Sequence, residues 1–431
     1  MASGCTSNGA GAIDSKYGFA AAKQVPGSKI TVLVDTTRQP LALAFQKEHP
    51  EVPIVIDTYD GNPGGSGSLQ AKIALDDQAG SGWPDVVFSS QTNDTAWAGK
   101  ETNGVQPYAA ALNKGLLDQS FLDGFAKGAN DPMTVDGTVY GLRNDLAPTV
   151  LWYDKSLFDQ FGYQIPTTWE DFQALSDQLA KDHPGYIMGS VGGGFMAVDA
   201  YYWAAAAPVF QVKGNKFTTN MSDPNSVAMT KLIDHMLANG TLTNKNVFDP
   251  AFIKNYKGKV LAMPGPAWFA GVIFQNPDSL GSAPGTVGAA NPLFWKGQKE
   301  VTGDVGGGVW YASSHSTNLK AVAEVLKYVT SSDQAVKLAS GLPGYKAAAD
   351  AWLDQQSSGG FFVGDFKGAM TKAAASVWTG FGFATFSSET AWDTKVNPVI
   401  ESGGTVASAV PAWQQELKNE AAIHGYTVTS K

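Results

Sequence analysis

The fold is decided by Lys29–Asp35 (KITVLVD) and by the alternation that follows it. This short apolar run is rich in β-branched residues, which is typical of a buried strand. Helical and strand patterns then alternate: a helix over 41–47 that ends near His49-Pro50, a strand over 52–59 (VPIVIDTY), a helix over 69–78 and a strand over 85–89 (DVVFS). Such alternation predicts crossover units on a mostly parallel sheet, and therefore an α/β fold.

The same α/β pattern continues through the rest of the chain. Thr167–Glu170 (TTWE) matches a capping box, in which Thr167 caps a helix and Glu170 reaches back to it. Trp169 and Trp352 fit apolar helical faces, so we expect both in the core. The further predicted elements are strands over 149–153 and 259–263, and helices over 225–239 (closed by Gly240), 318–330 and 405–422.

Composition excludes several classes of protein. Aromatic residues make up 11% of the chain, which is enough apolar surface to argue against disorder, and a single Cys cannot form an internal disulfide. The net charge of −9 comes without any basic run, so nucleic acid is not an expected partner. The five His residues are far apart, and no phosphate-binding or dinucleotide motif occurs, so we expect neither a metal nor a cofactor.

The first residues contain the lone Cys. Met1–Gly9 (MASGCTSNG) resembles the end of a bacterial lipoprotein signal, in which the Cys, here Cys5, receives a lipid. Residues 6–24 are rich in Gly, Ser and Ala and predict a flexible tether. The alternative is a disordered end with an incidental Cys. No run of 18 apolar residues predicts a membrane span.

Five stretches together resemble the ABC-transporter extracellular solute-binding proteins for sugars, the group that contains the maltodextrin-binding protein. They follow in the family's order after Lys29, although Arg143 and Asp154 replace the family's Pro and Asn. The stretches are 29–60 (with KITVLVD and AFQKEHPEVPIVIDTYD), 69–88 (LQAKIALDDQAGSGWPDVVF), 135–172 (VDGTVYGLRNDLAPTVLWYDKSLFDQFGYQIPTTWEDF), 263–271 (MPGPAWFAG) and 303–339 (GDVGGGVWYASSHSTNLKAVAEVLKYVTSSDQAVKLA).

The resemblance implies an α/β, two-lobe periplasmic-binding-protein-like fold of type II, whose lobes close on a ligand at a hinge. It implies a tether over 1–28, an N-terminal lobe over 29–144 plus about 304–350, and a C-terminal lobe over about 145–303 plus 351–431. The implied function is non-catalytic. A monomer, lipid-anchored to the outer face of the cell membrane, captures a sugar and delivers it to an ABC permease. The many Trp and Tyr residues favour an oligosaccharide.

Polar candidates for the ligand site lie where predicted strands end. A sugar presents hydroxyls that carboxylates and amides bind in pairs. Thr37 and Arg38 follow the first strand, at positions where the resemblance places polar sugar contacts. The other candidates are Asp60 after the second strand, Gln91 and Asn93 after the third, and Asn144 and Asp145 at the expected hinge crossing. For Asp145, the alternative is a helix cap or an ion pair.

Aromatic candidates would stack on the apolar faces of sugar rings. By resemblance, Trp268 and Trp392 lie near stacking positions of the family. Tyr201 and Tyr202 belong to an aromatic run in a region where the family also has a stacking ring, and Trp378 lies in a Gly-aromatic segment. For each of these residues, packing in the core is the alternative.

Two alternative functions remain open. Two carboxylates that meet in a cleft would suit a secreted glycoside hydrolase or lyase. The same fold with a different ligand would bind a polyamine, through several carboxylates, or a ferric ion, for which Tyr201-Tyr202 is the only adjacent Tyr pair.

Overall fold

The computed structural model describes residues 12–59, 61, 66–101 and 106–431, and it divides into two compact units. The first unit comprises the chain up to Asp145, with 307–338 and 343–349, and the second comprises 146–306, 339–342 and 350–431. Cys5 and Asp60 lie outside the described residues. No helix in the described part combines the length and apolar character needed to cross a membrane.

The first unit is built on a five-stranded sheet with the order β2-β1-β3-β13-β6. β1 pairs in parallel with β2 and β3, whereas β13 runs antiparallel to β3 and β6. The strands are β1 (Ile30–Asp35), β2 (Ile54–Tyr59), β3 (Val86–Ser89), β6 (Gly141–Arg143) and β13 (Val309–Ala312). Because β6 is antiparallel to β13, it runs in the same direction as β1, β2 and β3, so this sheet is mostly parallel, as expected, and β13 is its reversed strand. The chain re-enters this unit at Gly307, beside the end of β3, and so runs back along that strand.

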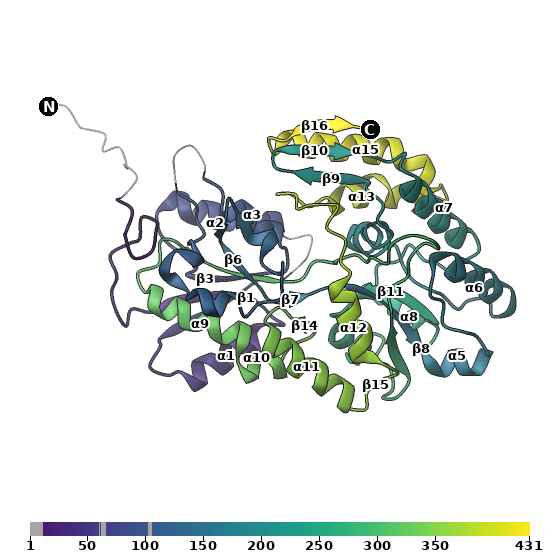
Figure 1. The fold of residues 1–431 in the computed structure, drawn as a ribbon, viewed down its shortest axis with the longest axis horizontal. Coiled ribbons are helices and arrows are strands. Elements are labelled where there is room, and N and C mark those ends of the chain that lie inside the picture. Colours follow the sequence, from purple (N-terminus) through teal and green to yellow (C-terminus); the bar gives the residue numbers. More distant parts are fainter. Residues whose placement is uncertain (1–11, 60, 62–65, 102–105) are drawn as a thin grey trace. The chain divides into compact units, whose positions relative to one another are not determined.

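Helices cover both faces of this sheet. Alternate residues such as Leu33, Val87 and Tyr311 form one apolar cluster with Leu69 and Ile73 of α2. On the other face α1, α9 and α10 pack side by side (Figure 1). The remaining elements of this part are α1 (Gln39–Glu48), α2 (Ser66–Ala79), α3 (Asn93–Ala98), η2 (Leu112–Leu116), α4 (Gln119–Leu122), η3 (Asp131–Met133), β4 (Thr134–Val135), β5 (Thr138–Val139), α9 (Leu319–Ser331) and α10 (Asp333–Lys337). Three elements contain or span a point where the chain passes between units: β7 (Asp145–Leu146), β14 (Leu342–Pro343) and α11 (Lys346–Ser358).

The second unit has a four-stranded sheet with the order β11-β8-β12-β15, and a three-stranded sheet with the order β16-β10-β9. Its fully buried Trp152 lies on the central strand β8. The strands are β8 (Thr149–Asp154), β9 (Phe210–Lys213), β10 (Lys216–Thr219), β11 (Ala262–Pro266), β12 (Val287–Ala290), β15 (Phe362–Val363) and β16 (Thr427–Ser430). The helices are α5 (Lys155–Phe161), α6 (Trp169–Asp182), η4 (Phe195–Trp203), α7 (Pro224–Ala238), α8 (Pro250–Tyr256), η5 (Ala270–Phe274), α12 (Phe366–Ala375), α13 (Glu389–Lys395), α14 (Asn397–Glu401) and α15 (Val406–Ile423).

Most predicted elements are confirmed, with two shifts in the second unit. The predicted strand over 259–263 is β11, which begins at Ala262 because the preceding residues form the turn after α8. The cap of α6 is Thr168, whose side chain accepts from the Asp171 amide at 3.1 Å, so the capping box predicted on Thr167 is one residue too early. Trp169 and Trp352 are buried, as predicted.

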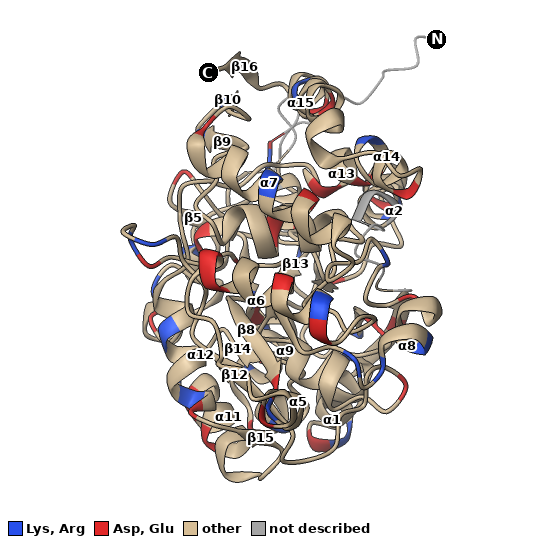
Figure 2. Ribbon diagram, turned by 90° about the vertical axis from the view of Figure 1, so that its right-hand side faces the viewer, with Lys and Arg blue, Asp and Glu red and all other residues tan. Residues whose placement is uncertain are grey.

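Charged positions are dispersed over the helices, with basic and acidic residues interspersed (Figure 2). Ion pairs such as Lys72–Asp76 and Lys155–Asp159 link residues one helical turn apart on exposed surfaces. Pairs of this kind contribute little to stability, since water screens them.

Candidate functional site

Polar side chains in the first unit gather at the carboxyl ends of its parallel strands. Asp35 ends β1 and Tyr59 ends β2, and the two residues are partners in the strand register. β3 ends at Ser89 beside them. Loops and helix starts that follow parallel strands therefore share one edge of the sheet, which is where α/β proteins bind ligands.

Arg38 is the centre of this polar edge. Its Nη1 lies 3.1 Å from Oδ2 of Asp35, and its Nη2 lies 4.0 Å from Oδ1 of Asp145. The guanidinium also lies over the Phe88 ring, 4.4 Å from its centroid. Only 18% of the Arg38 side chain is exposed, so one cation serves two carboxylates in a poorly hydrated place.

Asn144 and Asp145 are held by the residues around them. Asp145 Oδ1 accepts from the amide of Gly308 at 2.9 Å and from Asn144 Nδ2 at 2.8 Å. Asn144 Oδ1 accepts from the Trp310 indole at 2.8 Å. The structure thus brings Arg38, Asn144 and Asp145 together, with their polar groups already in an internal network.

Asn93 has a hydrogen-bond donor without a partner. Its Nδ2 is buried and makes no hydrogen bond in this structure. Next to it Asp94 accepts from Ser89 Oγ at 2.6 Å, and Gln91 is buried. A buried donor that lacks a partner destabilises the protein, and a ligand oxygen that accepts from it would remove this cost. Thr37 is exposed beside Arg38.

Tyr59 lies among these groups. Burial, followed by the charges of Asp35 and Asp94, raises the pKa of its phenol well above the ordinary value. Its Oη donates to the Phe88 carbonyl at 3.1 Å. Tyr59 therefore stays neutral over the physiological range and acts as a donor.

The second unit presents an aromatic triad formed by Phe195, Phe248 and Trp268. The rings of Phe248 and Trp268 are nearly parallel, with an interplanar angle of 9° and centroids 6.1 Å apart. Phe195 lies 5.9 Å from Phe248 and 6.4 Å from Trp268. Phe248 is 42% exposed, and Trp268 and Phe195 are half-buried. Water thus reaches part of each ring, which gives the triad an open apolar surface.

The position of Trp268 is fixed by its surroundings. The residue follows β11, and its indole donates to the Val305 carbonyl at 2.9 Å. Behind it, a Cβ on Gly341 would come within 2.8 Å of the Trp268 Cα, so only glycine fits there. Trp268 is therefore held as a rigid surface, which is what stacking requires.

The other predicted aromatic residues lie in different surroundings. Tyr201 and Tyr202 are completely buried, and Tyr202 Oη is 2.7 Å from Thr230 Oγ1. Trp392 is also completely buried; its indole donates to Asn397 and its ring lies 5.1 Å from that of Trp413. Trp378 is half-buried and packs 5.4 Å from Phe381, so it retains an accessible face.

Asp35, Phe195 and Phe248 were not predicted for the site. Asp35 is the last residue of a strand and looked like part of it. Phe195 follows the glycines 192–194, and Phe248 precedes the Asp249-Pro250 start of α8. An aromatic residue next to a loop glycine or a helix start is the signal that would have found the two Phe residues.

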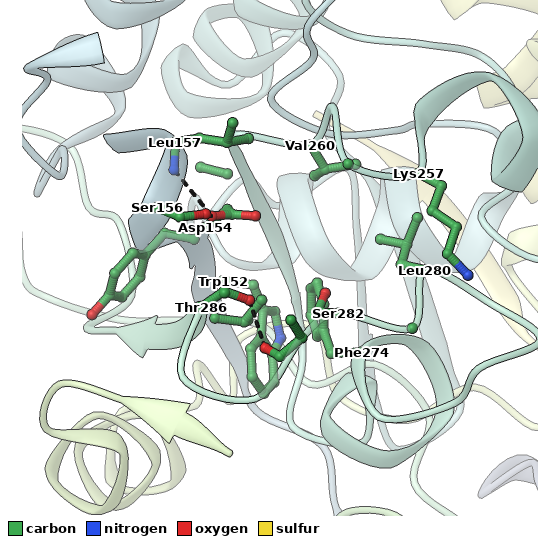
Figure 3. Close-up of a pocket in the computed structure, with 16 residues that line it drawn as sticks. Trp152, Asp154, Ser156, Leu157, Lys257, Val260, Phe274, Leu280, Ser282 and Thr286 are labelled. Carbon is green, nitrogen blue, oxygen red and sulfur yellow. Dashed lines mark hydrogen bonds between the residues drawn. The ribbon is translucent and has the colours of Figure 1, made fainter. Parts of the chain in front are cut away.

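A separate cavity of about 300 Å³ lies in the second unit, at the end of β8 (Figure 3). Its two charged groups already have partners. Asp154 caps α5 through the Leu157 amide, and Lys257 Nζ donates to the carbonyls of Pro277 and Ser279. Within the described residues, no group of three or more His, Cys, Asp or Glu side chains is arranged to hold a metal ion.

Comparison with known proteins identifies the family. The model of the bacterial extracellular solute-binding protein family matches residues 28–336, so the chain belongs to this family, whose members are binding proteins of transporters. In structure, the chain is similar to an ABC-transporter-associated binding protein from B. animalis subsp. lactis Bl-04, solved with β-1,6-galactobiose (TM-score 0.75, 21% identity, 93% of this chain and 99% of that one). It is also similar to the galacto-N-biose/lacto-N-biose I-binding protein of Bifidobacterium longum, solved with lacto-N-biose (TM-score 0.74, 20% identity, 94% and 100%). These likenesses confirm the predicted α/β fold of the periplasmic-binding-protein type.

Sequence relatives match over shorter stretches. The lactose-binding protein of Rhizobium radiobacter is 24% identical over 277 residues, which is 61% of this chain and 64% of that protein. Another curated relative is matched over 30% of its own length. The chain thus spans less than two thirds of the length of these two relatives.

Proposed function

We propose that this protein binds a carbohydrate, an oligosaccharide in particular, outside the cell and delivers it to the permease of an ABC transporter. The observation that carries the proposal is the aromatic triad, whose rigid and partly exposed rings suit the apolar faces of sugar rings. Structural neighbours that were solved with disaccharides, and a relative named as lactose-binding, support the choice of ligand.

The polar edge of the first unit is a second set of candidate ligand groups. Arg38, Asn93 and Asp145, with Asp35, present charged and amide groups that match neighbouring hydroxyls. Thr37, Gln91 and Asn144 extend this set, while Trp378 offers a further ring. The roles of Asp60, Tyr201, Tyr202 and Trp392 stay predictions, as does closure of the two lobes on the ligand.

A calorimetric screen of the purified protein tests the proposal. The panel contains lactose, β-1,6-galactobiose, lacto-N-biose, arabino-oligosaccharides and malto-oligosaccharides, with spermidine and ferric citrate as the other ligand classes. We expect at least one glycan to bind. Trp268→Ala should lower the affinity for that glycan about tenfold or more. A tenfold loss corresponds to roughly 1.4 kcal/mol, which is the contribution of one good ring contact.

Trp295→Ala is the matched control, because Trp295 is also a half-buried Trp of the second unit but lies outside the triad. Its glycan affinity should stay that of the wild type. Binding of spermidine or iron without any glycan would contradict the proposal. Shortened products after incubation with the bound glycan would instead favour the hydrolase or lyase.

The proposal includes a lipid anchor on Cys5 and a monomeric state. The intact mass of the protein from its native host tests the anchor, since an unmodified Cys5 would contradict it. Light scattering at micromolar concentration tests the monomer.

A further inference from the structure

Asp199 and Glu389 form a carboxyl pair behind the aromatic triad. Asp199 lies on η4, the helix that begins at Phe195, and only 6% of it is exposed. Glu389 is the first residue of α13 and is half-buried. A hydrogen bond between the two side chains is among the causes that shift the pKa of each carboxyl group. Two carboxyl groups make such a bond only when one of them is protonated.

The backbones of η4 and α13 are in close contact around this pair. The Gly194 amide donates to Asp393 Oδ1 at 2.8 Å. The Cα of Gly194 faces the Glu389 carbonyl and leaves no room for a Cβ, and Gly303 similarly faces the Asp199 carbonyl from the other side. Phe195 comes directly after Gly194, so any separation of η4 from α13 shifts this ring of the triad.

The charged groups that act on the pair are carboxylates. Asp304 acts on Asp199, and Asp393 acts on Glu389. Burial, then the charge of Glu389, raises the pKa of Asp199 well above its ordinary value. Burial raises the pKa of Glu389 to about 7, although the hydrogen bond from Asp199 opposes the rise. Both groups thus retain protons at pH values where exposed carboxyl groups have lost them.

We propose that Asp199 and Glu389 are a proton-dependent positioning pair, which seats η4 on α13 and so holds Phe195 in the triad. With a proton between them, the two carboxyl groups attract each other. Without it, two negative charges repel each other in a poorly hydrated place, and Asp304 and Asp393 add to the repulsion. The stability of the second unit therefore depends on pH near neutrality, whatever ligand the protein takes.

The direction of the pH effect follows from linkage. Because both pKa values are raised on folding, the folded state binds more protons than the unfolded state. The stabilisation of the folded state by the protonated pair is fully present below the ordinary carboxyl pKa of about 4. It is lost as pH rises through about 7 and beyond. Removing either carboxyl group should therefore flatten the dependence.

Thermal unfolding without ligand, from pH 5 to pH 8, tests the pair. The wild-type melting temperature should fall over this range, and Asp199→Asn and Glu389→Gln should each reduce the fall by about 2 to 4 °C. An Asn or Gln amide can still donate to the remaining carboxylate, so these variants should fold. Glu401→Gln, on the exposed surface of α14, is the matched control and should retain the wild-type profile.

Infrared difference spectra give a second readout. The wild type at pH 7 should show the C=O stretch of a protonated carboxyl group, and this band should be lost or reduced in both variants. Parallel pH profiles for wild type and both variants, or no protonated carboxyl band, would overturn the inference.

The link to ligand affinity rests on the proposed function. If a glycan binds, its affinity should decline from pH 6 to pH 8 in the wild type and less in Glu389→Gln. If the pH dependence of stability is found but no glycan binds, the proposed function is refuted. The inference of a positioning pair would still hold.

Discussion

At the scale of single residues, Arg38 shows how one side chain organises a polar edge. It holds Asp35 and Asp145, whose side chains are only 7% and 5% exposed, and it covers Phe88 with its planar group. Two carboxylates this close to each other and to the protein interior need a cation. The candidate ligand groups of the first unit are therefore already held in position in the structure without a ligand.

Arg38→Met should destabilise the protein by about 1–3 kcal/mol, because it leaves two buried carboxylates without their cation. Urea unfolding at pH 7 measures the change. In the double variant with Asp35→Asn, part of the loss should be recovered, since one of the orphaned charges is gone.

Lys320→Met serves as the control for Arg38→Met. Lys320 pairs with Glu324 at 3.9 Å on the exposed surface of α9, and loss of such a pair should cost less than about 1 kcal/mol. Equal losses in the two variants would show that Arg38 is an ordinary surface residue.

The residue scale is also where prediction from sequence reaches its limit. Trp268 and Trp392 are both candidate stacking residues by resemblance, yet Trp268 is half-buried and Trp392 has no exposed surface. The difference arises from tertiary neighbours: α15 brings Trp413 against Trp392, whereas Gly341 leaves space at Trp268. No local pattern encodes either contact.

At the scale of elements, apolar periodicity predicted the strands and the long helices well. α9 is an example, because Leu319, Val322, Leu326 and Val329 lie on one buried face. Periodicity did not predict the π-helix η4, because nearly all its side chains are buried and it has no polar face to show its period. It likewise could not assign direction to β13, which depends on where the chain re-enters the unit.

The start of α6 gives a prediction at the element scale. Thr168→Ala should cost about 1 kcal/mol, because it removes the acceptor for the Asp171 amide. Thr167→Ala, one residue earlier, should change stability by only a few tenths of a kcal/mol, since its exposed hydroxyl makes only a 3.4 Å contact with Asp171. Chemical denaturation measures the stability of both variants. A larger loss of stability in Thr167→Ala would show that Thr167 is the cap of α6.

At the scale of the whole molecule, neither unit is one continuous piece of chain. The chain passes between units after Asp145, Gly306, Leu338, Leu342 and Ala349. The first-unit sheet shows the result, because β13 lies between β3 and β6 although it follows β6 by more than 160 residues. The order of motifs along the chain was enough to predict this class of fold.

A fragment with residues 12–145 should therefore fail to fold, because its sheet lacks the strand between β3 and β6. Joining residues 307–349 to the fragment through a flexible linker should restore folding. Far-UV circular dichroism and a cooperative urea transition separate the two outcomes. A cooperative transition in the short fragment would show that β13 is dispensable.

The position of β13 in the sheet also determines when, during synthesis, the sheet of the first unit can be completed. About 220 residues separate β3 from β13, and a ribosome that adds roughly 5–20 residues per second needs about 10 to 40 s to cover them. During that interval the first strands have emerged but have no complete sheet to join. A chain that completes its first unit so late therefore has an unfinished first-unit sheet throughout that interval.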